Sequence, residues 1–252
     1  MRSVILAAIA AAAMAPEAGA TTVDFVASYG LSNDLAAADN NHHPQGLGYD
    51  AAAGELLFMQ QNAFTIYSTD LTGVVQSSRS IAQRYTTSVA ADATRYYYTD
   101  YTANAGGIDL YAIDKTSGSE TAFSTEIAGY GGYPIDVRDG KLYRTEASTG
   151  YSWSNLDQLR ISSLSTPDTI DTVLTLATPF GIGDIAIDLD RHVLWTLDYA
   201  AAASIREFDL TSGLQLAEFD LDLDGLAGGL TYADDRLYHY DWNTGSGSTL
   251  SV

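Results

Sequence analysis

The amino-acid sequence predicts an all-β fold, a β-propeller of five four-stranded blades closed by an N-terminal strand. Three observations predict it: a strand that recurs five times, polar turns at matching places in each copy, and a last copy that lacks one strand. The composition agrees, because 17 Tyr and 22 Gly among 252 residues are typical of sheets and tight turns.

The recurring strand occupies residues 55–59, 95–99, 141–145, 193–197 and 236–240. We align the copies on one aromatic side chain in each and expect these side chains to pack between blades: Phe58, Tyr97, Tyr143, Trp195 and Tyr238. Their separations of 39, 46, 52 and 43 residues match the period of about 40–50 residues that is typical of propeller blades.

Each copy follows another strand that ends in a polar turn. Asp or Gly stands at that turn in every copy: Asp50, Asp92, Asp139-Gly140, Asp188 and Asp234-Asp235. Both residue types accept tight-turn geometry at little cost. Three copies close a third strand with similar residues, at 70–73, 114–118 and 209–213. A two-sheet sandwich is the alternative architecture, but it gives no reason for a fivefold copy of one hairpin.

The two ends of the chain predict how the ring closes. The last copy has a third strand near 248–252 and no fourth. The segment Thr22–Ser28 precedes the first copy and has no partner in it, so we expect this segment to complete the last blade. Such a join leaves only short blade edges exposed.

Residues 1–20 have the pattern of a secretory signal peptide. An apolar run, Val4–Met14, follows Arg2 and is too short to span a membrane as a helix. Ala18-Gly19-Ala20 matches the small-residue cleavage pattern. A buried N-terminal helix is the alternative. We therefore expect one propeller domain over residues 21–252, secreted or periplasmic and without membrane insertion.

Charge and cysteine content exclude several function classes. The formal net charge is −20 and there is no Cys. So acidic a surface repels nucleic acid, and the absence of thiols excludes redox and thiolate-metal chemistry.

Parts of the repeat resemble known propeller families. The segments 43–50, 183–188, 192–198 and 208–213 are similar to blade motifs of the NHL, YncE and lactonase-like propellers, so the chain resembles a secreted bacterial propeller with such blade repeats. The resemblance covers blades rather than one whole protein. It implies a propeller, and for the lactonase-like members a channel cation held by acids, for which Asp184 and Asp136 are candidates here.

Carboxylates recur three residues after the aligned aromatics, and aromatic side chains often follow them. We expect these positions, with two residues near the same rim, to form a ligand-binding face: Asp100, Tyr101, Glu146, Trp153, Asp198, Tyr199, Asp241, Trp242 and His43. Carboxylates accept hydrogen bonds from sugar hydroxyls, and rings stack on sugar faces. The alternative is that the acids cap turn amides and the rings cover the neighbouring blade.

A second acidic motif, Asp220, Asp222 and Asp224 before Gly225, has the alternation of a calcium loop. Its twelfth position is Thr231 rather than Glu, so an outer strand with acids toward solvent is the alternative. Ca²⁺ is the only cofactor that the sequence suggests.

The sequence lacks the common metalloprotease, serine hydrolase and phosphate-loop motifs. We therefore expect a non-catalytic binding or scaffold propeller that recognises a glycan or a protein through its loop-rich face. The alternative is a calcium-assisted hydrolase, lactonase- or glycosidase-like, with a carboxylate-lined channel.

Overall fold

The computed structural model describes residues 21–22, 28–30, 44–60, 64–82, 86–100, 108–124, 134–148, 155–181, 183–198, 203–221, 226–242 and 249–251. These residues form strands and turns only, in five sheets. The described part of the chain contains no helix that could cross a membrane.

Each of the five sheets contains four strands in antiparallel order, which confirms five four-stranded blades, and one sheet has the short β1 as a fifth, parallel strand at its edge. Blade 1 contains β3 (Pro44–Asp50), β4 (Glu55–Gln60), β5 (Thr65–Thr69) and β6 (Val75–Ser80). Blade 2 contains β7 (Thr86–Ala91), β8 (Arg95–Asp100), β9 (Ile108–Asp114) and β10 (Glu120–Ser124). Blade 3 contains β11 (Ile135–Arg138), β12 (Lys141–Glu146), β13 (Leu156–Ser163) and β14 (Ile170–Phe180).

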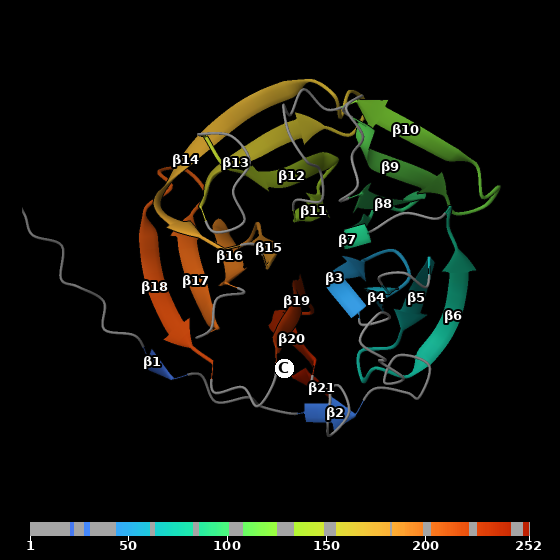
Figure 1. Ribbon diagram of the computed structural model, residues 1–252, viewed down its shortest axis with the longest axis horizontal. Helices are drawn as coiled ribbons and strands as arrows, with labels where there is room; N and C mark the ends of the chain where they lie inside the picture. The colour runs from blue at the N-terminus through green and yellow to red at the C-terminus, as the bar shows by residue number, and fades with distance from the viewer. Residues whose placement is uncertain are drawn as a thin grey trace, which may run out of the picture.

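Blade 4 contains β15 (Asp184–Asp188), β16 (Val193–Asp198), β17 (Ser204–Asp209) and β18 (Gln215–Asp220). Blade 5 contains β19 (Leu226–Ala233), β20 (Arg236–Trp242), β21 (Thr249–Ser251) and β2 (Ser28–Gly30). The first strand of every blade lies at the centre of the ring, and the fourth lies at the rim (Figure 1). Neighbouring first strands contact one another all the way around, from β3 through β7, β11, β15 and β19 back to β3.

The inner strands approach so closely that glycine is required where they meet. Gly46 has a positive φ of 81°, and a Cβ there would lie 2.6 Å from the Cα of Ser88 in blade 2. A Cβ on Gly229 would lie 2.6 Å from the backbone nitrogen of Leu47. Any side chain at either position would push two blades apart.

An N-terminal strand closes the ring, as predicted, but not with the expected residues. The strand that completes blade 5 is β2, whose Tyr29 is paired with Leu250 of β21. Thr22 belongs instead to β1 (Thr21–Thr22), which runs parallel to β18 at the outer edge of blade 4. Residues 23–27, the middle of the predicted strand, lie outside the described residues. The N-terminal segment therefore contacts two blades rather than one.

The core consists of five clusters of buried side chains, each shared by two neighbouring blades. Four of the aligned aromatics, Tyr97, Tyr143, Trp195 and Tyr238, are buried and face the blade that follows their own in the ring.

Phe58 is also buried, but it belongs to the cluster that blade 1 shares with blade 5, the blade before it in the ring. Leu57 faces blade 2 and is the true equivalent. The alignment of blade 1 was wrong by one residue, because both faces of β4 are buried and its apolar side chains do not alternate with polar ones.

The predicted turn chemistry is present between the third and fourth strands of blades 1, 2 and 4. In three turns one aspartate accepts backbone N–H groups through its Oδ1 atom: Asp70 from Thr72 and Val74, Asp114 from Thr116 and Ser117, and Asp209 from Thr211 and Ser212. The pKa of each carboxyl lies below its usual value. For Asp70 burial is the largest single effect and raises the pKa, but the hydrogen bonds from Thr72 and Val74 together outweigh it. For Asp114 and Asp209 the hydrogen bonds from the turn are themselves the largest effect. Glycine with positive φ ends each turn, at 73, 118 and 213.

Removal of β1 and β2 tests the closure. A chain that starts at residue 31 should unfold at a clearly lower temperature than one that starts at residue 21, because blade 5 loses its outer strand and Tyr29 leaves its cluster. Thermal denaturation of the two chains measures the difference. Equal melting temperatures would contradict closure by the N-terminal strand.

Trp195 tests the packing between blades. Its side chain is only 7% exposed and lies against Phe219, with ring centroids 6.1 Å apart. Trp195→Ala should reduce the free energy of unfolding by about 3–5 kcal/mol. Leu214, which is 58% exposed, is the control, and its replacement by Ala should cost no more than about 0.5 kcal/mol. Urea denaturation gives both values, and similar costs would contradict the assignment of Trp195 to the core.

Candidate functional site

A buried carboxyl group, that of Asp184 of β15, lies at the axis of the ring and connects four blades. Its Oδ2 accepts the backbone N–H groups of Leu47 in blade 1 (2.8 Å) and Leu230 in blade 5 (3.2 Å). Its Oδ1 accepts the hydroxyl of Ser88 in blade 2 (3.3 Å) and the N–H of Ile185 (3.0 Å). The two oxygens of this one side chain therefore accept hydrogen bonds from four donors.

Blade 3 joins the same system through Asp136 and Ser88. Asp136 Oδ2 accepts the backbone N–H of Ile187 in blade 4 at 2.8 Å, and the Nε atom of Arg138 lies 3.1 Å from it. The hydroxyl of Ser88 accepts the N–H of Ile135 at 3.1 Å. Asp184 and Asp136 thus connect the blades, and hydrogen-bond donors surround the oxygens that a channel cation would need.

Both axial carboxyls have raised pKa values. Burial raises the pKa of Asp184 to about 8, the three backbone N–H bonds act in the opposite direction, and the nearby charge of Asp136 adds a smaller increase. Burial also raises the pKa of Asp136, against the effects of Arg138 and the amides of Ile187 and Val137. Neither group resembles an ordinary surface acid.

The predicted ring of acids lies at the ends of the second strands, where the chain enters the loop that leads to the third strand. Asp100, Glu146 and Asp198 are all largely buried. Glu146 forms an ion pair with Arg160 (2.5 Å), and Asp198 Oδ2 lies 3.4 Å from Arg206. These three acids stand at the same position of their blades, and two of them, Glu146 and Asp198, are paired with an arginine of the third strand.

Several predicted site residues cannot be placed beside these acids. Asp241 and Trp242 belong to β20, but their side chains are not described. Four further candidates lie outside the described residues: Tyr101, Trp153, Tyr199 and His43. Their part in a ligand-binding face stays a prediction.

Of the predicted calcium loop, only Asp220 is described; Asp222 and Asp224 are not. Asp220 is exposed at the end of β18, where it is paired with Ser204 and Thr22. Among the described residues, no group of three or more His, Asp or Glu side chains is arranged to hold a metal ion.

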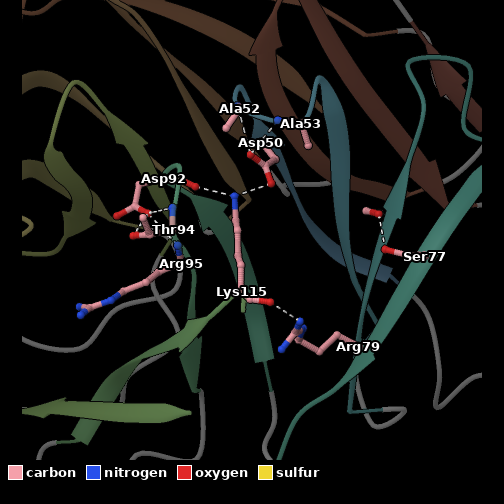
Figure 2. A network of polar contacts seen from close by, with 10 residues as sticks. Asp50, Ala52, Ala53, Ser77, Arg79, Asp92, Thr94, Arg95 and Lys115 are labelled. Carbon is pink, nitrogen blue, oxygen red and sulfur yellow. Dashed lines mark hydrogen bonds and ion pairs between the residues drawn. The ribbon is translucent and has the colours of Figure 1, made fainter. Parts of the chain in front are cut away.

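A polar network between blades 1 and 2 was missed by the sequence analysis (Figure 2). The Nζ atom of Lys115 lies 2.5 Å from Asp50 Oδ2 and 2.5 Å from the carbonyl oxygen of Asp92. A signal was present, because Lys115 stands where the two similar turns have Leu71 and Leu210.

His239 was also missed as a buried group. It is 1% exposed, and burial lowers its pKa to about 3. The imidazole is therefore neutral at physiological pH.

Comparison with known proteins shows the fold. No protein-family model matches the chain, and no curated protein matches its sequence. The crystal structure of glutaminyl cyclase from Myxococcus xanthus is similar, with a TM-score of 0.64 and 13% identity over 90% of this chain and 94% of that chain. A nidogen–laminin complex contains a chain with a TM-score of 0.55 and 16% identity over 80% of this chain and 73% of that chain.

These similarities and the five sheets define the class: the chain is a five-bladed β-propeller. At such identities the neighbours show the architecture alone. The blade-level resemblance to NHL, YncE and lactonase-like propellers has no family match behind it and stays a prediction.

The raised pKa of Asp184 predicts a pH dependence of stability. The folded state keeps this proton up to about pH 8, whereas the unfolded chain loses it near about pH 4. The free energy of unfolding should therefore decrease as the pH rises between these values, by up to about 1.4 kcal/mol per pH unit from this group. Urea denaturation at pH 5, 6, 7 and 8 measures the slope.

Asp184→Asn should make that slope smaller, whatever its effect on absolute stability. Asp209→Asn is the control, because hydrogen bonds from Ser212 and Thr211 lower the pKa of Asp209 and move its titration below this range. A slope that is equal in wild type and Asp184→Asn would contradict the assignment.

Proposed function

We propose that the protein is an exported, non-catalytic binding or scaffold propeller that recognises a glycan or a protein through its loop-rich face. The observation that carries this proposal is the position of Asp100, Glu146 and Asp198. All three stand at the base of the loops that follow the second strands, on a ring whose blades are joined at the axis.

The lengths of the connections support the choice of face. First and second strands are joined by two to four residues, as at 139–140 and 51–54. Several of the connections that leave the second strands or join two blades are longer, for example 101–107, 147–155 and 125–134. Long loops on a rigid scaffold are where binding surfaces usually occur.

The ion pairs favour binding over catalysis. A general acid or nucleophile must reach a substrate atom, whereas Glu146 and Asp198 face Arg160 and Arg206. The solved propellers of similar shape include an enzyme, glutaminyl cyclase, and a chain of a nidogen–laminin complex. The fold therefore permits either catalysis or binding, and the choice between them depends on the residues of the site.

Loop variants test the proposal. The mature chain 21–252 is screened on a glycan array and by thermal melts, and the best ligand is titrated. Tyr101→Ala/Trp153→Ala should bind it at least about tenfold more weakly, because aromatic anchors carry much of a binding energy. The melting temperature should change little.

The control changes two exposed side chains of hairpins, Leu189→Ala/Leu214→Ala, and should bind as the wild type does. Equal loss in both variants, or no ligand at all, would contradict a loop-face site. Chelator-sensitive hydrolysis of lactones or glycosides on added Ca²⁺ would favour the calcium-assisted hydrolase instead.

Mass spectrometry of the exported protein should find Thr21 at its N-terminus if the predicted signal peptide is cleaved.

A further inference from the structure

Blade 1 differs from the other four blades at one position of its outer strand. In each blade an apolar residue of the third strand faces the next blade, and its partner on the fourth strand is known from the register. These partners are Phe123 opposite Leu110, Leu174 opposite Leu159, Phe219 opposite Ile205 and Tyr29 opposite Leu250. In blade 1 the partner of Ile66 is Arg79.

The apolar partners fill the space where two blades diverge. Phe123, Leu174 and Phe219 each pack against the cluster shared with the next blade. Arg79 cannot fill the corresponding space in the same way, since its charged end must keep polar contacts. A pocket of about 170 Å³ remains between blades 1 and 2, lined by Ile66, Ser68, Ser77, Ser78, Arg79 and Tyr96.

Arg79 reaches from β6 to the carbonyl oxygen of Lys115 in blade 2 (Figure 2). Its Nη2 donates to the carbonyl oxygen of Lys115 at 2.7 Å, its Nη1 lies 3.5 Å from the carbonyl oxygen of Asp114, and its guanidinium lies 5.8 Å from the ring centroid of Tyr96. Arg79 forms no ion pair with a carboxylate among the described residues, although the chain has 32 acidic residues. Its positive charge therefore stays available to an anionic group.

The other walls carry hydroxyl groups and an aromatic ring. The hydroxyls of Ser68 and Ser77 are 2.7 Å apart, so each can also bond to a third group. Tyr96 contributes its ring to the wall, and Lys115 lies 4.9 Å from the ring centroid while it pairs with Asp50. Ile66 supplies an apolar surface at the pocket.

We propose that this pocket binds a single acidic sugar residue, with its carboxylate on Arg79 and its hydroxyls on Ser68 and Ser77. A guanidinium is the preferred partner of a carboxylate, and charge-assisted hydrogen bonds are the strong ones. An aromatic ring beside hydroxyls suits the mixed apolar and polar surface of a sugar. This proposal does not depend on the one made for the loop-rich face.

Size and charge agree with one sugar ring. The pocket of about 170 Å³ is smaller than the roughly 300–1,000 Å³ of sites for drug-sized ligands. The net charge of −20 repels one carboxylate only weakly at physiological ionic strength, where the screening length is about 8 Å.

A purely structural role for Arg79, as a tie between two blades, predicts different behaviour from a binding role. Arg79→Phe copies the side chain of Phe123 and Phe219, so it should fill the pocket and keep the melting temperature at or above that of the wild type. It also removes the cation. Arg79→Gln removes the charge but leaves the pocket open.

The experiment is calorimetric titration of the mature chain with sodium D-glucuronate and D-galacturonate, and with glucose and galactose as neutral probes. The wild type should bind at least one uronate about tenfold or more tightly than its neutral sugar. Arg79→Phe and Arg79→Gln should both lose that preference, and Ser77→Ala should weaken uronate binding. Arg236→Gln, which changes an exposed arginine of blade 5, should bind as the wild type does.

Three results would overturn the proposal. The first is the absence of uronate binding to the wild type, and the second is uronate binding that Arg79→Phe leaves unchanged. The third is equal binding of uronate and neutral sugar. Each result leaves the loop-face proposal intact, because the Tyr101→Ala/Trp153→Ala variant tests that proposal in a separate titration with its own ligand.

Discussion

The ring depends on a carboxyl group that is removed from water and shared among blades. Asp184 accepts N–H groups from Leu47 and Leu230 and a hydroxyl from Ser88, so one side chain contacts three blades other than its own. Inner strands at the axis of a propeller belong to separate sheets, and their backbone groups there have no regular ladder partner. A buried amide without a partner would cost about 1–3 kcal/mol. A short acid with two oxygens satisfies several such groups at once.

The close approach of the inner strands follows from the same requirement. Gly46 and Gly229 allow backbone atoms of adjacent blades to come near enough for Leu47 and Leu230 to reach Asp184. The clusters between blades then supply the apolar burial that stabilises the domain. Polar groups therefore determine the arrangement at the axis, and apolar side chains determine the packing farther out.

The blade pattern could be predicted because hairpin turns are local: Asp and Gly at the turns depend on a few neighbouring residues. The alignment of blade 1 with the other blades could not be predicted. Leu56 and Leu57 are buried on opposite faces of β4, and a strand with two buried faces does not alternate between apolar and polar residues. The closing strand was misplaced because β2 has only three residues. The sequence analysis named Asp184 as a candidate ligand of a cation. Its role in joining the blades could not be predicted, because its partners Leu230 and Leu47 are 46 and 137 residues away in the sequence.

The pairing of β2 with β21 places the first and last strands of the ring in one sheet. A ribosome or a translocation channel releases β2 long before β21, so the last blade cannot form until nearly the whole chain has emerged. Until then the apolar faces of Leu56 and Phe58 in blade 1, which blade 5 will cover, remain open to water. Contacts between residues so far apart in sequence are slow to form. The ring is therefore completed late in folding. The net charge of −20 helps to keep the chain soluble until the last blade forms.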